Sequence, residues 1–195
     1  MNQKIKAVIF DLNGVFLKSE PLSLRLEEKY GVNVDSLLPI LKMALKSARL
    51  PNANPDIWLP LTNLLKISKD QLFDFWFSGE SVDTDLLKYA NELKNAQYKV
   101  MVLSNNFRER TNYYRQHFPE IFNCINKSYF SWETGFVKPD ISAFELLLKE
   151  NNLKPNECIY FDDSEENVKI AQNIGINSFI YVDLEETRKI ISGFA

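Results

Sequence analysis

The chain has 195 residues, 45% of them hydrophobic and 25% charged, and this composition predicts a folded protein rather than a disordered one. The net charge of −3 gives no support for a nucleic-acid-binding surface, which usually needs a clustered basic face. No apolar run approaches the ~20 residues that a membrane-spanning helix needs, and the N-terminus has no signal-peptide pattern. We therefore expect a cytoplasmic protein with one large domain, or with a core and a small inserted domain.

The first predicted element is a strand over residues 7 to 10. Ala7, Val8, Ile9 and Phe10 are apolar without alternation, which is typical of a strand buried on both faces of a parallel sheet. Asp11 follows at the expected carboxyl end of this strand, where open α/β sheets place their ligands. A helix-capping aspartate after a first strand is the alternative, and this short stretch leaves both interpretations open.

Residues 17 to 83 show no convincing buried strand and are expected to be helical. The expected helices are Pro21–Tyr30, Asp35–Arg49, Asp56–Leu65 and Lys69–Phe77. Asp35 is a plausible N-cap of the second helix, and Ser68 with Gln71 matches a capping box before the fourth. The aromatic residues of this segment are expected to form the core of a small helical bundle rather than a ligand cage: Trp58, Phe73, Phe75, Trp76 and Phe77.

From residue 84 onwards, predicted strands alternate with predicted helices. The expected strands are Lys99–Leu103, Lys127–Phe130, Cys158–Phe161 and Ser178–Val182. The expected helices are one marked by Leu86, Tyr89, Ala90 and Leu93, then Arg108–His117, Ile141–Glu150, Glu165–Asn173 and a C-terminal helix. Gly175 is a candidate left-handed C-cap. This alternation predicts an α/β fold with a parallel, doubly wound sheet.

Polar residues follow three of the predicted strands. These are Asp11, Ser104, and Asp162 with Asp163, and each alone could be a helix cap. Together with Lys138 they are expected to meet along one edge of the sheet. Three carboxylates at one edge repel each other unless a cation is present, and Mg²⁺ prefers such oxygen ligands. Lys138 and the Ser104 hydroxyl are suited to holding an anionic group.

This set of residues points to phosphoryl transfer without histidine. A carboxylate beside Mg²⁺ can act as a nucleophile and form an acyl-phosphate, while the metal and the lysine stabilise the negative charge that develops. His117 is the single histidine, and a structural or surface role is expected for it. Cys124 and Cys158 lack a metal-binding spacing and are expected to be buried, inert thiols.

The chain resembles the haloacid dehalogenase (HAD) superfamily of hydrolases, whose four motifs occur in order. These are Asp11-Leu12-Asn13-Gly14-Val15, Val102-Leu103-Ser104-Asn105, Lys138-Pro139-Asp140 and Asp162-Asp163-Ser164-Glu165-Glu166-Asn167. The spacing of Ser131, Glu133, Gly135 and Lys138 resembles the branch with the phosphatase domain of soluble epoxide hydrolase and small bacterial sugar-phosphate phosphatases. The resemblance implies a Rossmann-like core over 1–16 and 84–195, a helical cap over 17–83 and strand order 3-2-1-4-5.

The resemblance also implies a Mg²⁺-dependent phosphatase that acts on a small phosphorylated metabolite. Asp11 is then the nucleophile and a metal ligand, and the backbone carbonyl of Asn13 also binds the metal. Asp163 is then a direct metal ligand, while Asp162 binds directly or through water. The phosphoryl group is held by Ser104 and Asn105, and Lys138 orients and screens Asp11.

Asn13 departs from the pattern of the family, whose phosphatases usually carry an aspartate there to protonate the leaving group and activate water. An amide cannot exchange that proton near neutral pH. Three other interpretations therefore remain. The chain could be a 2-haloacid dehalogenase with Arg25 or Arg49 as the halide-binding arginine, or a phosphonatase with Lys42 or Lys46 as the cap lysine. It could also be a catalytically weak member that binds a phosphorylated ligand or protein partner.

Overall fold

The core of the protein is a sheet of five parallel strands in the order β5-β4-β1-β6-β7. The computed structural model describes residues 4–194. The strands are β1 (Ala7–Phe10), β4 (Lys99–Ser104), β5 (Lys127–Phe130), β6 (Cys158–Asp162) and β7 (Asn177–Ile180). Numbered along the chain within this sheet, the order is 3-2-1-4-5. This confirms the predicted doubly wound α/β fold and its strand order.

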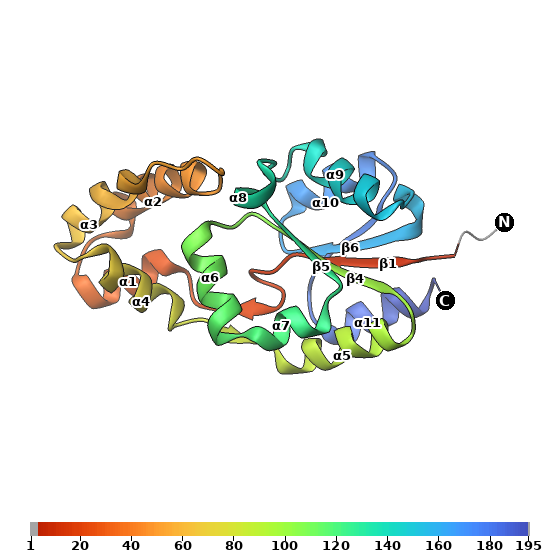
Figure 1. Cartoon of the computed structure of the whole chain (residues 1–195). Helices are drawn as coiled ribbons and strands as arrows, with labels where there is room; N and C mark the ends of the chain where they lie inside the picture. Colours follow the sequence, from red (N-terminus) through yellow and green to blue (C-terminus); the bar gives the residue numbers. More distant parts are fainter. Residues whose placement is uncertain (1–3, 195) are drawn as a thin grey trace.

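Helices cover both faces of the sheet (Figure 1). One face carries α5 (Thr84–Asn95), α6 (Arg108–His117), α7 (Pro119–Cys124) and α11 (Leu184–Ser192). The other carries α9 (Ile141–Asn151) and α10 (Glu165–Asn173). Val8 and Phe10 pack into the first layer, and Ala7 and Ile9 into the second. All four are fully buried, which explains why β1 shows no polar alternation.

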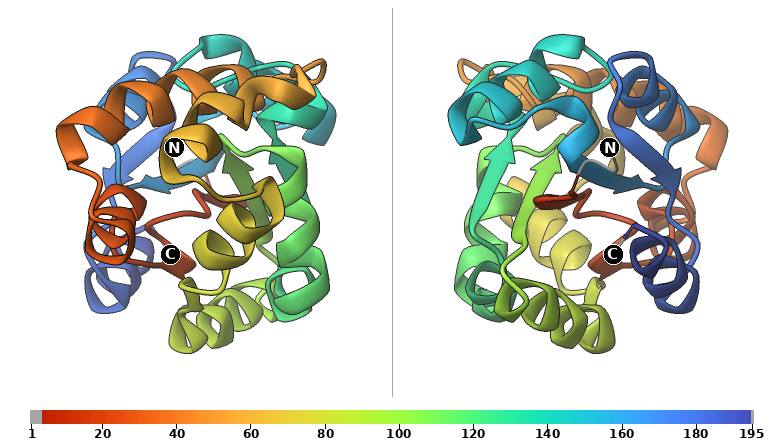
Figure 2. Two further views of the ribbon diagram at one scale, coloured as in Figure 1. Left: turned by 90° about the vertical axis from the view of Figure 1, so that its left-hand side faces the viewer. Right: turned by 90° about the vertical axis from the view of Figure 1, so that its right-hand side faces the viewer.

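A helical segment lies at one end of the sheet, opposite the end where the two termini lie (Figure 1). It consists of α1 (Leu22–Tyr30), α2 (Val34–Ala48), η1 (Pro55–Trp58), α3 (Leu59–Leu65) and α4 (Lys69–Phe77). The chain enters it through β2 (Leu17–Lys18) and leaves through β3 (Ser81–Val82), and these two short strands pair antiparallel. Seen from that end, the segment lies in front of the sheet (Figure 2, left). The predicted helical character of this segment is confirmed.

The helical segment has its own aromatic core, but one member of this core comes from outside the segment. Trp58, Phe73, Trp76 and Phe77 are at most 7% exposed, as expected for core residues. Phe107, which follows β4, inserts among them and is 1% exposed. Its ring centroid lies 5.1 Å from that of Trp58 and 5.3 Å from that of Trp76. The segment and the sheet domain therefore share part of a hydrophobic core.

Several local predictions were wrong in detail. The N-cap of α2 is Asn33, not Asp35, because the Asn33 side chain accepts a hydrogen bond of 2.8 Å from the Asp35 N–H. The third expected helix is divided into η1 and α3. The last strand ends at Ile180, so that Val182 lies beyond it and is 67% exposed. Three short helices were not predicted: α7, α8 (Ser131–Thr134) and η2 (Pro155–Glu157).

The histidine and the cysteines have no arrangement that suggests chemistry. His117 is exposed and stacks on Tyr113, with ring centroids 3.9 Å apart. Both thiols are free and buried, and burial raises the pKa of Cys124 to about 11 and that of Cys158 to about 12. Across residues 4–194, no helix is long and apolar enough to cross a bilayer.

Candidate active site

The polar residues at the strand ends do meet at one edge of the sheet. Asp11 follows β1, Ser104 ends β4 and Asp162 ends β6, and β1 lies between the other two strands. Carboxylate oxygens of Asp11, Asp162 and Asp163 lie within 4.8 Å of one another. Parallel strands end at a common edge, so the sheet order alone brings these side chains together.

Lys138 joins this cluster from the loop between α8 and α9. Its Nζ lies 3.0 Å from Asp11 Oδ1 and 2.5 Å from Asp162 Oδ2. The Lys138 side chain is 2% exposed. The Asn105 amide holds the backbone of Lys138 on both sides, donating to its carbonyl at 2.7 Å and accepting from its N–H at 2.8 Å. The Asn105 side chain therefore positions Lys138.

Asp162 is fully buried and its carboxylate is surrounded by donors. It accepts hydrogen bonds from the Ser164 N–H at 2.8 Å, from Asn167 Nδ2 at 3.0 Å and from the Tyr160 hydroxyl, in addition to Lys138. Burial alone would raise its pKa, but Lys138 and these hydrogen bonds leave the pKa below its usual value. Asp162 is thus an ionised group with little remaining capacity for another ligand.

In contrast to Asp162, Asp163 and Asp11 have carboxyl groups whose pKa is raised. Partial burial, followed by the negative charges of Asp11 and Asp162, raises the pKa of the Asp163 carboxyl to about 6. Burial also raises the pKa of Asp11, although Lys138 opposes this shift. A cation beside Asp11 and Asp163 would favour their ionised forms, and their hard oxygen atoms fit Mg²⁺. The helix α10 is capped by Ser164, so Asp163 is not its N-cap.

The Asn13 side chain is fixed by a buried network. Its Nδ2 donates a hydrogen bond of 2.8 Å to the hydroxyl of Tyr114, a residue of α6 that is fully buried. One turn earlier on the same helix, Arg110 pairs with the buried carboxylate of Glu80. Asn13 Oδ1 is buried and has no hydrogen-bond partner within residues 4–194. The amide therefore offers an acceptor in the site but no exchangeable acid.

A cavity of about 370 Å³ opens above this cluster. Five of the predicted site residues line it: Asp11, Asn13, Asn105, Lys138 and Asp163. Ser104 and Asp162 lie behind this surface and are at most 2% exposed. Arg49, at the end of α2, and Arg110 also line the cavity. No sequence pattern indicated Arg110, because it occupies an ordinary helix position.

The other residues of the helical segment that were considered from the sequence do not reach this cavity. Arg25 donates hydrogen bonds to the carbonyl oxygens of Phe75 and Trp76, at 2.6 and 3.0 Å, and so joins α1 to α4. Lys42 and Lys46 are exposed on α2 and do not line the cavity. Of these four candidates, only Arg49 lies in the site.

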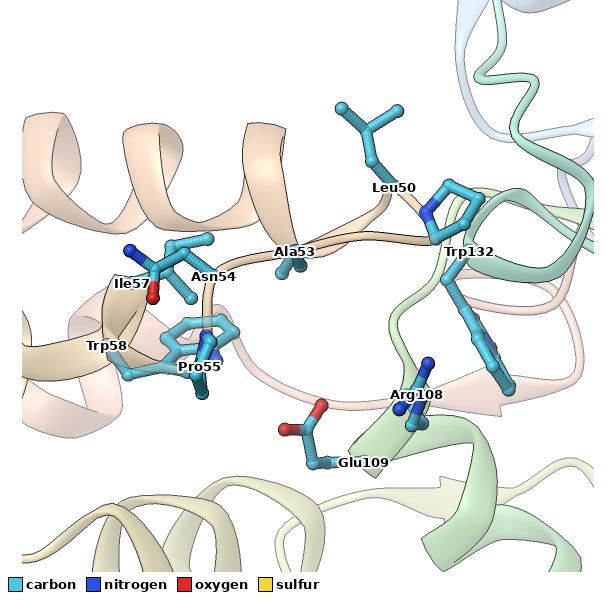
Figure 3. Close-up of a pocket in the computed structure, with 11 residues that line it drawn as sticks. Leu50, Ala53, Asn54, Pro55, Ile57, Trp58, Arg108, Glu109 and Trp132 are labelled. Carbon is cyan, nitrogen blue, oxygen red and sulfur yellow. The ribbon is translucent and has the colours of Figure 1, made fainter.

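A second cavity, of about 270 Å³, lies between the helical segment and the sheet domain. Figure 3 shows Pro55 and Trp58 on one side of it, and Arg108 and Trp132 on the other. The Arg108 guanidinium lies 5.2 Å from the centre of the Trp132 ring. None of the predicted site residues lines this cavity, so we treat it as separate from the site.

Comparison with known proteins identifies the family of this chain. The model of the haloacid dehalogenase-like hydrolase family matches residues 5–175. The chain belongs to this family, which confirms the resemblance found in the sequence, and it is a hydrolase.

This chain is 23% identical to rat bifunctional epoxide hydrolase 2 over 130 residues, which are 63% of this chain and 24% of that protein. It is 30% identical to the D-ribitol-5-phosphate phosphatase of Bacteroides thetaiotaomicron over 54 residues, which are 28% and 26% of the two chains. The chain thus spans about a quarter of each relative.

Solved structures show the same fold over nearly the whole chain. A HAD family enzyme from Bacteroides thetaiotaomicron, solved as a magnesium complex, has a TM-score of 0.79 at 23% identity and covers 97% of this chain and 99% of its own. A complex with magnesium and inorganic phosphate has a TM-score of 0.78 at 22% identity, over 94% and 98%. An L-2-haloacid dehalogenase has a TM-score of 0.68 at 12% identity, over 91% and 86%.

Gly14 provides a test of the position of Asp163. Its φ is +87°, and a Cβ at this position would lie 2.2 Å from Asp163 Oδ2. We expect Gly14→Ala to lower the free energy of unfolding by about 1–2 kcal/mol because of the left-handed backbone. We also expect it to weaken Mg²⁺ binding, because the Asp163 carboxylate must move. Urea unfolding and calorimetric titration with Mg²⁺ measure the two effects.

Gly31→Ala is the matched control for this variant. Gly31 has φ of +68° and no atom within 4 Å of its potential Cβ. It should show a similar loss of stability with unchanged Mg²⁺ affinity. Equal Mg²⁺ affinities for the two variants would show that the contact between Gly14 and Asp163 does not matter for metal binding.

Proposed function

We propose that this protein is a Mg²⁺-dependent phosphatase of a small phosphorylated metabolite, acting through an aspartyl-phosphate on Asp11. The observation that carries this proposal is the cluster in which Asp11 contacts Lys138 and faces Asp163 at the edge of the cavity. Further support comes from the similarity to a ribitol-phosphate phosphatase and to an enzyme solved with magnesium and phosphate.

The proposed role of each carboxylate follows from its surroundings. Asp11 and Asp163 hold Mg²⁺ together with the backbone carbonyl of Asn13. Both carboxyl groups line the cavity, and their pKa is raised, so that a cation beside them would stabilise the ionised forms. Asp162 instead holds Lys138, because its oxygens already accept four donors. When bound, Mg²⁺ supplies positive charge beside the phosphoryl oxygens.

In the proposed first step, a carboxylate oxygen of Asp11 attacks phosphorus. An O–P bond forms, the bond to the leaving oxygen breaks, and the leaving group departs as an alcohol once it gains a proton. The ammonium group of Lys138 favours the ionised form of Asp11 and offsets charge on the phosphoryl group. Asn105 contributes by fixing Lys138, and Ser104 contributes its hydroxyl at the end of β4.

In the second step, water attacks phosphorus, the O–P bond to Asp11 breaks, and inorganic phosphate leaves as the Asp11 carboxylate is restored and solvent takes the proton of the attacking water. The Asn13 amide can accept a hydrogen bond from this water through Oδ1, but it cannot take the proton. Both steps therefore lack the carboxylic acid that usually serves them, and we propose a slow phosphatase that favours acidic leaving groups.

The proposed organisation is a core of residues 1–16 and 84–195 with a cap of residues 17–83. The antiparallel pair of β2 and β3 supports these boundaries, because the chain leaves and re-enters the sheet domain there. Arg49, at the end of α2, brings the helical segment to the cavity wall, as a substrate-facing cap requires.

Phosphate release from a panel of phosphorylated metabolites and from p-nitrophenyl phosphate tests the proposal. We expect release that depends on Mg²⁺ and falls by at least about a thousandfold in Asp11→Asn, because the nucleophile is lost. Equal release by wild type and Asp11→Asn would reject the covalent mechanism. Phosphate binding without any release would instead support the weak phospho-ligand-binding alternative.

A 2-haloacid dehalogenase is the second candidate. It is favoured by the presence of Arg49 in the cavity and by the shared fold with L-2-haloacid dehalogenase. Chloride release from 2-chloropropionate would support it. The phosphonatase interpretation has no comparable support, since Lys42 and Lys46 lie outside the cavity.

A further inference from the structure

Arg49 is a partly buried cation of the site with no ion-pair or hydrogen-bond partner within residues 4–194. Its Nε is buried and unpaired, and the side chain lines the cavity that contains Asp11. Burial, followed by the charge of Arg110, lowers the pKa of Arg49, whereas Asp11 opposes this shift. A charged group in such surroundings is costly unless a partner of opposite charge is present.

The neighbouring carboxylates form no ion pair with Arg49. Glu80 is already paired with Arg110, and Asp11 with Lys138. Asp162 is paired with Lys138. Glu166, another carboxylate of the cavity lining, is exposed on the first turn of α10.

The charge of the loaded site points to an anionic ligand. Asp11, Asp162 and Asp163 contribute three negative charges, and Lys138 with Mg²⁺ contributes three positive charges. Because Arg110 and Glu80 cancel, Arg49 remains as the excess positive charge of the buried part of the site. A phosphate monoester carries about two negative charges at neutral pH. The Mg²⁺-bound site and the substrate are therefore complementary in charge, with Arg49 as the source of the positive charge.

We propose that Arg49 binds the phosphoryl oxygens of the substrate and is the residue through which the helical segment takes part in the reaction. The proposal rests on the phosphatase function inferred above. A guanidinium suits this task because its planar N–H groups match phosphate oxygens in pairs. The function of the segment then includes charge stabilisation of the reacting group, as well as covering it.

Binding of inorganic phosphate in the presence of Mg²⁺ tests this directly, measured by calorimetry on the full chain. We expect Arg49→Gln to weaken phosphate binding by at least about tenfold, because a charge-assisted hydrogen bond is lost. Arg49→Lys should give an intermediate affinity, since it keeps the charge but not the paired geometry. Mg²⁺ affinity without phosphate should not fall in either variant, whereas a disordered site would lose it.

Arg108→Gln is the matched control. It removes the same charge from the start of α6, but Arg108 lines the second cavity and lies over Trp132. Its phosphate affinity should stay within about twofold of wild type. Equal affinities for Arg49→Gln and wild type, or equal losses in the Arg49 and Arg108 variants, would overturn the proposal. A wild type that neither binds phosphate nor releases it from any ester would instead reject the phosphatase function itself.

Discussion

Replacing Asp163 with alanine should lower the Mg²⁺ affinity of the protein by at least about a hundredfold. Loss of a residue that only supports a metal ligand already costs about 10–100-fold in affinity, and we propose Asp163 as a direct ligand. The physical reason is that Asp162 is occupied by Lys138, Tyr160 and backbone, so it cannot replace the missing oxygen. Calorimetric titration with Mg²⁺ measures the effect.

Stability without Mg²⁺ gives a second readout on the same variant. The raised pKa of Asp163 means that its proton stabilises the fold below about pH 4, and that this stabilisation is lost as the pH rises through about 6. At pH 7.5 the ionised carboxylate is therefore unfavourable. Asp163→Ala should be at least as stable as wild type to urea when Mg²⁺ is removed.

Asp140→Ala is the control for an ordinary capping role. Asp140 is the N-cap of α9 and accepts a hydrogen bond of 2.9 Å from the Ser142 N–H. Its loss should cost roughly 1 kcal/mol of stability and leave Mg²⁺ binding intact. If Asp163→Ala showed this same pattern, the assignment of Asp163 to the metal would be wrong.

Replacing Asn13 with aspartate should raise turnover of alkyl phosphates by at least about tenfold. General acid–base assistance is typically worth ~10²–10⁴-fold, and the amide cannot provide it. The change is nearly isosteric, and the new carboxylate can accept a hydrogen bond from Tyr114, whose raised pKa keeps its hydroxyl protonated. The gain with p-nitrophenyl phosphate should be smaller, because its leaving group needs less protonation. Steady-state kinetics on both substrates measure the difference.

Asn13→Ala is the control that distinguishes the effect of adding a carboxylate from the effect of losing the Asn13 amide. It also removes the hydrogen bond from the Asn13 amide to Tyr114 but adds no carboxylate, so it should not accelerate turnover of either substrate. Equal rates for wild type and Asn13→Asp on alkyl phosphates would show that another group already performs this proton transfer. Acceleration by Asn13→Ala would show that the amide itself hinders the reaction.

The parts of the site that follow sheet topology could be predicted from the sequence. Asp11, Ser104 and Asp162 end apolar strands, and adjacent parallel strands must bring such residues to one edge. The different surroundings of Asp162 and Asp163 could not be predicted, because they depend on Tyr160 and Asn167, which point at one carboxylate and not at the other.

The parts that depend on contacts between distant elements could not be predicted either. Arg49 belongs to the helical segment and Arg110 to α6 of the sheet domain, and only the packing of these two parts brings both residues to the cavity. The N-cap at Asn33 was missed for a local reason. Asn33 and Asp35 are both good capping residues, and the backbone conformation of Asn33, with φ of −57° and ψ of 136°, decides between them.

The position of Phe107 would oppose any movement that separates the helical segment from the sheet domain. This ring belongs to the sheet domain but is buried among Trp58, Phe73 and Trp76 of the helical segment. Swinging the segment away from α6 would expose it to water, at a cost of about 1.5–3 kcal/mol. If the open form loses only this contact, about one protein molecule in ten to one in two hundred would be open at any time. The rate of substrate binding would then be limited by the small population of the open form. A smaller side chain at position 107 would lower the stability of the protein and increase the rate at which substrate enters.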